Sequence, residues 1–222
     1  RVVTVDVSDL APIVVVPPSP ANTRDLTEYA GLEVHMGYLG SCASGRLEDL
    51  RVAAQVLKRG GNAVDAAVAT AFTLAITYPE AGNIGGGGFM TLFMDGKPYF
   101  LDYRETAPKA ASKTMYLDDK GEVIENLSLV GAKAAGVPGT VLGMWEAHKR
   151  FGKLPWSELL TPAIGYANTG FKVADQQFQY REDAIGLFNG QTNFTAHFGS
   201  MRPGEVFKQP LMAKTLAVSY TH

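Results

Sequence analysis

The sequence has little that would hold a metal, a disulfide or a nucleic acid. It contains one cysteine, Cys42, in 222 residues, which excludes an intrachain disulfide and a multi-cysteine metal site. The histidines His35, His148 and His197 do not have the spacing of metal ligands. The 20 basic and 22 acidic residues give a formal net charge of -2, without the basic surplus of a nucleic-acid-binding protein. We therefore expect no metal site and no nucleic-acid partner.

Long apolar runs are also missing. The most apolar stretch, 63–76, is too short and too rich in alanine to cross a membrane. No signal peptide is visible at the start of the chain. Apolar residues make up 46% of the sequence and charged residues 19%, a balance typical of globular proteins. At this length such a composition supports a sizeable core, so we expect a globular chain without a membrane span.

Apolar periodicity predicts two consecutive helices. Over 47–59 the apolar residues recur at intervals of three and four, and a glycine pair follows as a stop. Asn62 can then cap a second helix over 63–76, with Asp65 placed to complete a capping box. Because this second helix is apolar on nearly every side, we expect it to be buried.

A β-hairpin is predicted next. Phe89 to Met94 has the composition of a strand, and so does Tyr99 to Tyr103. The turn between them, 95–97, begins with an Asp-Gly pair, which is typical of tight hairpins. We expect the two strands to pair antiparallel.

Two more helices follow, and the two ends of the chain are harder to interpret. The pattern predicts helices over 140–150 and 155–168, the second closed by Gly170, after which the periodicity weakens. At the start, 1–40 is irregular, with a short β-branched strand at 13–16 before a proline-rich linker.

The longest glycine run separates the buried helix from the hairpin and consists of Gly85, Gly86, Gly87 and Gly88. A phosphate-binding loop would need a lysine and a hydroxyl residue after its glycines, and it would open a helix. Here Phe89 and Met90 follow and begin a strand. We therefore predict a structural role: a close approach of two backbone segments, in conformations that other residues cannot reach.

Three sequence blocks occur in series. They are GGNAVDAAVATAFTLAITYPEAGNIGGGGFM at 60–90, LDYRETAP at 101–108, and GVPGTVLGMWEAHKRFGKLPWSELLTPAIGYANTGF at 136–171. Together they resemble the γ-glutamyltransferase (glutathione hydrolase) family, over most of the chain. The resemblance implies that 41–217 is the N-terminal part of that family's large subunit. It leaves 1–40 as an irregular N-terminal segment, and 218–222 as a tail left by truncation or cloning.

The resemblance implies an α+β fold of the N-terminal-nucleophile hydrolase type. This fold is an αββα sandwich of two sheets between helical layers, and the chain would hold only an N-terminal fragment of it. In the family the precursor cleaves itself, and a threonine at the new N-terminus of the small subunit is the nucleophile. The matched blocks lie upstream of that residue, and Thr221 is not its counterpart. We therefore expect no catalytic residue in this chain, no activity from it alone, and no metal or organic cofactor.

The resemblance assigns substrate binding to Arg104 in the block DYRETAP. A γ-glutamyl donor such as glutathione carries a free α-carboxylate, which a guanidinium can bind through two parallel hydrogen bonds. Spacing alone leaves open a local role in which Arg104 only pairs with Asp102 or Glu105 at a strand end. With the family blocks in place, we expect Arg104 to bind the donor, Glu105 and Asp102 to support it, and the four glycines to be structural.

Two other functions stay open. One is a glutaryl β-lactam (cephalosporin) acylase of the same family, whose substrate also presents a carboxylate to Arg104 but has no α-amine. The other is a truncated, non-catalytic binding or assembly partner, which the coding sequence beyond His222 would distinguish. The expected partners are the rest of the large subunit and the small subunit of the same precursor. The resemblance also implies a periplasmic or extracellular location.

Overall fold

The computed structural model describes residues 13–15, 23–25, 47–188, 190 and 192–221. Cys42 and His35 lie outside these ranges. The chain divides into two compact units, 1–39 and 40–222. In the first unit, strand β1 (Ile13–Val15) pairs antiparallel with strand β2 (Thr23–Asp25). The first of these strands was predicted and its partner was not.

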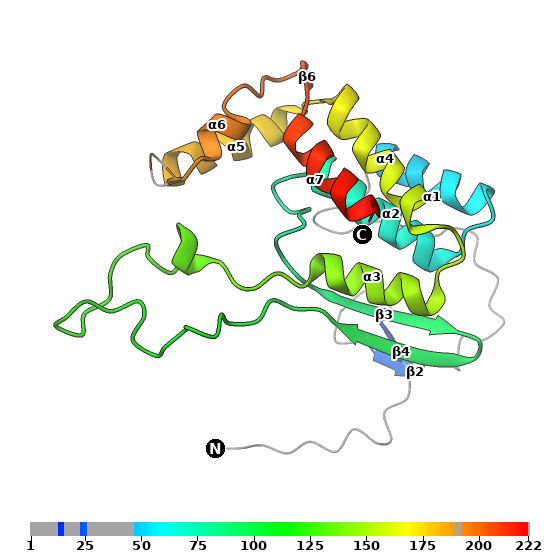
Figure 1. Ribbon diagram of the computed structural model, residues 1–222, viewed down its shortest axis with the longest axis horizontal. Helices are drawn as coiled ribbons and strands as arrows, with labels where there is room; N and C mark the ends of the chain where they lie inside the picture. Colours follow the sequence, from blue (N-terminus) through cyan, green and yellow to red (C-terminus); the bar gives the residue numbers. More distant parts are fainter. Residues whose placement is uncertain (1–12, 16–22, 26–46, 189, 191, 222) are drawn as a thin grey trace. The chain divides into compact units, whose positions relative to one another are not determined.

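The second unit combines helices with short antiparallel strand pairs (Figure 1). Its elements are α1 (Leu47–Lys58), α2 (Ala63–Thr77), β3 (Phe89–Met94), β4 (Lys97–Asp102), the 3-10 helix η2 (Ala132–Ala134), α3 (Thr140–Phe151), α4 (Trp156–Thr169), β5 (Phe171–Lys172), α5 (Asp175–Phe188), α6 (Phe194–Phe198), β6 (Val206–Phe207) and α7 (Pro210–Thr221). The helices predicted over 47–59, 63–76, 140–150 and 155–168 are therefore confirmed. Among the described strands, β3 pairs with β4 and β5 with β6.

Helix α2 begins at the predicted capping box. The Asn62 side chain accepts hydrogen bonds from the backbone N–H groups of Val64 and Asp65, and Asp65 Oδ2 accepts one from the Asn62 N–H at 2.9 Å. The Asp65 carboxylate also accepts N–H groups of Lys153 and Leu154, at 3.1 and 3.3 Å, in the loop between α3 and α4. One fully buried carboxylate thus caps α2 and fixes a loop far along the chain.

The core lies around α2, which packs against α1 and α4, while α4 packs against α7. The side chains of Val68, Phe72 and Ile76 are completely or almost completely buried, as predicted for a helix that is apolar on nearly every side. Phe72 meets Trp156 of α4 edge to face, with 5.5 Å between ring centroids. Trp156 therefore packs against the most deeply buried helix.

The C-terminal end of α2 is held by two glutamines from later in the chain. Gln177 of α5 donates from Nε2 to the Thr77 carbonyl at 2.8 Å, and Gln209 donates to the Ile76 carbonyl at 2.7 Å. The last carbonyls of a helix have no partner within the helix, so these two side chains continue the hydrogen bonding where the helix ends.

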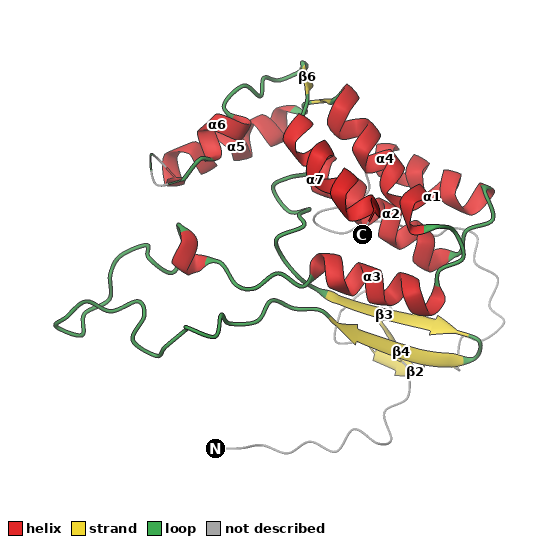
Figure 2. Cartoon of the chain, in the orientation of Figure 1, coloured by secondary structure: helices red, strands yellow, loops and turns green. Residues whose placement is uncertain are grey.

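The hairpin forms as predicted, with a tighter turn. Asp95 and Gly96 have φ of 52° and 75°, and positive φ at both central residues is what a two-residue type I′ turn requires. Met94 therefore pairs with Lys97, so β4 begins two residues before the predicted Tyr99. Figure 2 shows α3 lying along the hairpin, and α3 contacts β4.

The two faces of the hairpin differ in exposure. Met90, Leu92 and Leu101 pack against the core. The opposite face carries three large aromatic side chains that are more than half exposed: Phe89, Phe93 and Phe100. An apolar sheet face of this kind is typical of a surface that another layer covers.

Candidate functional site

Arg104 directly follows β4, and hydrogen bonds fix the backbone on both sides of it. The Tyr103 N–H donates to the Gly88 carbonyl at 3.0 Å, which extends the hairpin ladder past the last strand residue. Three residues after Tyr103, the chain forms an antiparallel bridge in which Thr106 and Val137 exchange hydrogen bonds of 3.2 and 2.8 Å. Arg104 is therefore held between the glycine run and the segment that leads into α3.

The glycine run makes the close backbone approach that was predicted. A Cβ on Gly87 would lie 2.5 Å from the Tyr103 carbonyl oxygen and 2.8 Å from Cα of Arg104, so no larger residue fits without a backbone shift. The Gly86 carbonyl accepts the N–H groups of Gly139 and Thr140, at 2.8 and 3.0 Å, where α3 begins. The run thus joins the hairpin to the helix that covers it.

The conformational part of that prediction is wrong. None of Gly85, Gly86, Gly87 and Gly88 has a positive φ, so their backbone conformations are open to other residues. What requires glycine is contact, and the requirement differs along the run. A Cβ on Gly87 would meet backbone, whereas one on Gly85 would meet nothing within 4 Å.

Two glycines in and before α3 have the same role and were missed by the sequence analysis. A Cβ on Gly139 would overlap the Tyr103 carbonyl, and one on Gly143 would overlap the first atoms of the Tyr103 side chain. Tyr103 is therefore seated against glycines of α3, and burial raises the pKa of its hydroxyl above the ordinary value. The glycine spacing in GVPGTVLG was the available signal, because small residues permit close approach.

The Arg104 side chain has one ionic partner and one aromatic partner. Its Nε lies 3.1 Å from Oε2 of Glu105, and its Cζ lies 5.7 Å from the centroid of the Phe89 ring. Asp102 contacts the backbone instead, because its Oδ1 accepts the Arg104 N–H at 3.0 Å. Both predicted supporting residues therefore touch Arg104, whereas the part played by Phe89 was not foreseen.

The end of the guanidinium is open. The Arg104 side chain is 60% exposed, and among the described residues its two terminal nitrogens make no hydrogen bond or ion pair. The local pairing with Glu105 that spacing left open does occur, but it uses only Nε. An exposed pair of this kind adds little stability. The arrangement leaves two parallel N–H donors for a planar anion.

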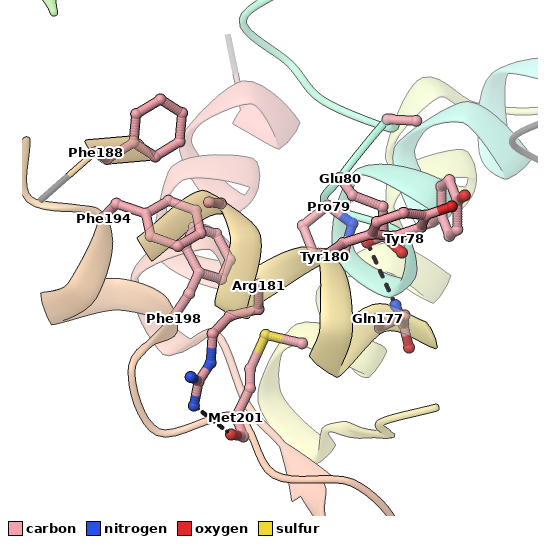
Figure 3. A pocket seen from close by; sticks show the side chains of 12 residues that line it. Tyr78, Pro79, Glu80, Gln177, Tyr180, Arg181, Phe188, Phe194, Phe198 and Met201 are labelled. Atoms are coloured by element: carbon pink, nitrogen blue, oxygen red, sulfur yellow. Dashed lines mark hydrogen bonds between the residues drawn. The ribbon is translucent and has the colours of Figure 1, made fainter. Parts of the chain in front are cut away.

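A cavity of about 510 Å³ lies elsewhere, where the end of α2 faces α5 and α6 (Figure 3). One of its charged side chains, Arg181, points toward the Met201 carbonyl, and Nη2 donates to the carbonyls of Gly199 and Met201 at 3.0 and 2.8 Å. Glu182 pairs with its Nη1, and only its Nε lacks a hydrogen bond. Burial, together with the nearby charge of Arg202, lowers the pKa of Arg181. Because this guanidinium is occupied by the chain itself, the cavity offers no arginine fork to a substrate.

Neither histidine in the described part of the chain is placed for metal binding. His148 Nε2 lies 2.8 Å from the Leu154 carbonyl, and His197 Nε2 lies 3.0 Å from Asn193. Within the described ranges no group of three histidine, cysteine or acidic residues could hold a metal ion. A search of the same residues finds no helix long and apolar enough to cross a membrane.

The chain is similar to proteins of one family. The family profile described as gamma-glutamyltranspeptidase matches residues 51–218. A glutathione hydrolase proenzyme of Pseudomonas aeruginosa is 85% identical over 166 residues, which cover 75% of this chain and 30% of that protein. The solved gamma-glutamyltranspeptidase from Pseudomonas nitroreducens, complexed with L-DON, has 77% identity and a TM-score of 0.79, covering 82% of this chain and 54% of that one. A cephalosporin acylase from Bacillus halodurans has a TM-score of 0.71 and covers 86% of this chain and 39% of its own, at only 23% identity.

These similarities place the fold in the N-terminal-nucleophile hydrolase class, as predicted. Within that class the chain belongs to the γ-glutamyltranspeptidase family. The acylase, at its low identity, shows the shared fold alone. The chain spans about a third of the length of the curated relatives it matches.

Proposed function

We propose that this chain is the N-terminal part of the large subunit of a glutathione hydrolase that transfers or hydrolyses γ-glutamyl groups. The 85% identity with the Pseudomonas aeruginosa proenzyme supports this assignment. It favours a γ-glutamyl substrate over a glutaryl β-lactam, because the cephalosporin acylase is only 23% identical. The remaining large-subunit sequence and the small subunit of the precursor are the proposed partners, and the proposed location is the periplasm or the exterior of the cell.

In this proposal Arg104 binds the α-carboxylate of the donor. The observation that carries the proposal is the open end of its guanidinium, with Nε held by Glu105 and the terminal nitrogens unused by the described residues. Two parallel charge-assisted hydrogen bonds from that end would fix both the position and the plane of the carboxylate. Glutathione is the proposed donor because its γ-glutamyl group presents that carboxylate at the end remote from the scissile amide.

The chemical step would come from outside this chain. A threonine Oγ of the small subunit attacks the γ-carbonyl carbon, its proton passes to the threonine's own amine, and the amide C–N bond breaks as the leaving amine takes up a proton. Water or an amino acid then releases the glutamyl group from the threonine. Arg104 would contribute by holding the donor so that its γ-carbonyl meets the nucleophile.

The test uses a chimeric precursor in which residues 51–218 of this chain replace the matching segment of the Pseudomonas aeruginosa proenzyme. Arg104→Lys keeps the charge and loses the fork, so KM for a γ-glutamyl donor should rise about tenfold or more. Self-cleavage should survive, because that step breaks a backbone bond and uses no donor.

Arg150→Lys is the matched control. Arg150 is 61% exposed and its Nε lies 3.6 Å from Glu146, so it repeats the exposure and pairing of Arg104 away from the proposed site. Its KM should equal that of the unmodified chimera. Equal KM values for Arg104→Lys and the unmodified chimera would refute the binding role.

A further inference from the structure

Phe89 lies on the same face of the hairpin as Arg104. The register pairs Phe89 with Asp102, so residues two positions to either side of Asp102, Phe100 and Arg104, are its diagonal neighbours on that face. The contacts agree with this geometry. The Phe89 and Phe100 rings stack with 5.6 Å between centroids, and Arg104 Cζ lies 5.7 Å from the Phe89 centroid. Phe89 therefore lies between a second ring and the guanidinium.

Two contacts of different kinds thus restrict the Arg104 side chain. Glu105 holds Nε through an ion pair, and the Phe89 ring lies within the distance at which an arginine is attracted to the π system. Neither contact uses the terminal nitrogens. A long arginine side chain loses much rotamer entropy when it becomes fixed. A side chain that is already restrained loses less of that entropy when a ligand arrives.

We propose that Phe89 is a positioning residue for Arg104, whose ring holds the guanidinium in the orientation that receives the α-carboxylate of the donor. This inference rests on the proposed function of Arg104. Phe89 acts through Arg104 and touches no reacting atom. Loss of the ring should therefore weaken donor binding and leave the chemical step nearly unchanged.

The first test is Phe89→Leu in the chimeric precursor, which keeps an apolar side chain and removes the π system. KM for γ-glutamyl-p-nitroanilide should rise about three- to tenfold, with kcat changed less than about twofold. Phe89→Tyr keeps the ring and should restore KM to within about twofold of the unmodified chimera. A fall in kcat with unchanged KM, or a failure of Phe89→Tyr to restore KM, would overturn the proposal.

Phe93→Leu is the matched control. Phe93 belongs to the same face and is similarly exposed, at 65% against 56% for Phe89, but it lies four residues further along β3, away from Arg104. Its replacement should leave KM unchanged. Equal rises for Phe89→Leu and Phe93→Leu would show that the face matters only for packing, which overturns a specific role for Phe89.

A second measurement does not depend on the leucine variant folding. Phenylalanines with one to five ring fluorines at position 89 keep the shape of the ring while progressively removing its negative face. KM should rise stepwise with fluorination if the ring attracts the guanidinium. A KM that is flat across the series would overturn the proposal.

The last comparison separates this inference from the proposed function. With Arg104→Ala already present, adding Phe89→Leu should not change KM further, because the ring has nothing left to position. An equal effect of Phe89→Leu with and without Arg104 overturns the positioning role alone. If Arg104→Lys itself leaves KM unchanged, the proposed function and this inference fall together.

Discussion

Two arginines of this chain each lie over a phenylalanine ring, and their surroundings otherwise differ. Arg104 Cζ is 5.7 Å from the Phe89 centroid, and Arg181 Cζ is 4.7 Å from the Phe178 centroid. The Arg181 side chain is 7% exposed and donates to backbone carbonyls, whereas the Arg104 side chain is 60% exposed with its terminal nitrogens unused by the described residues. Stacking is common to both. What distinguishes the two side chains is the hydrogen-bonding capacity that each guanidinium has left over.

The difference arises from the elements that carry them. Arg181 is on α5 and faces the loop at 199–201, so the chain folds back and supplies acceptors for its guanidinium. Arg104 follows the last residue of β4, on the hairpin face whose aromatic side chains stay exposed. One arginine is enclosed by its own unit, and the other is at a face that the described residues leave open.

The largest expected effect is on catalysis and comes from Arg104→Ala. Losing the carboxylate partner should lower kcat/KM for a γ-glutamyl donor. The loss should correspond to about 2–5 kcal/mol of transition-state stabilisation. The thermal unfolding midpoint should hardly change, because the residue is exposed and its ion pair is weak. Steady-state kinetics of the processed chimera check the expected loss of kcat/KM, and a melting curve checks the expected unfolding midpoint. Two results together would show instead that Arg104 is a structural residue. The Arg104→Ala variant would fail to fold, and the unmodified chimera would turn over a donor without an α-carboxylate at the normal rate.

Arg181→Ala should show the opposite pattern. Removing this buried guanidinium should lower the free energy of unfolding by about 2–4 kcal/mol, with KM unchanged in the molecules that fold. Arg202→Ala is the control, because exposed Arg202 donates from Nη1 to the same two carbonyls, at 2.8 and 2.7 Å. Its cost should stay near or below about 1 kcal/mol. Urea unfolding curves measure both free energies of unfolding. Equal losses of stability for Arg181→Ala and Arg202→Ala would contradict a structural role specific to Arg181.

Gly143→Ala should affect both stability and donor binding. The added methyl group would overlap the Tyr103 side chain, so stability should fall by about 1–3 kcal/mol and KM should rise as Arg104 shifts. Gly165→Ala is the matched helical control, since its Cβ would meet nothing within 4 Å. That change should stabilise the protein by about 0.5–1 kcal/mol at unchanged KM. Destabilisation without any change in KM would show that Tyr103 does not set the position of Arg104.

The smallest effect concerns pH. Burial raises the pKa of Tyr103 above the ordinary 10.0, so the unfolded chain releases this proton first. The stability from the neutral hydroxyl is therefore complete below about pH 10 and is lost as pH rises above it. Tyr103→Phe should decline less steeply in melting temperature than the parent between about pH 9.5 and 11. If the melting temperatures of the two proteins decline in parallel, Tyr103 does not contribute to the pH dependence of stability.

Sequence patterns predicted α2, whose buried side chains are mostly apolar, and missed α5. Helix α2 was visible because its buried side chains include Val68, Phe72 and Ile76, and its capping box starts it at Asn62. Helix α5 was not visible, because the two residues it buries are polar, Gln177 and Arg181. Their partners are carbonyls of distant segments, which no local periodicity reveals.

The contacts around the candidate site were predicted to a similar extent. The block DYRETAP led us to propose Arg104 as the binding residue, and its neighbours Glu105 and Asp102 do contact it. The contact with Phe89 was also within reach, because a two-residue Asp-Gly turn fixes the register and hence the diagonal pair. The seating of Tyr103 against Gly143 was not, because it joins segments that only the tertiary fold brings together.

The bridge between Thr106 and Val137 has a consequence for how sequences of this kind can change. It closes the base of the excursion formed by residues 107–136, immediately after the Arg104–Glu105 pair. Lengthening a loop whose ends are already joined costs little, about 0.6 kcal/mol for each doubling. Insertions and deletions within 107–136 should therefore accumulate without displacing the guanidinium, and variation in length should stop at the two bridged residues.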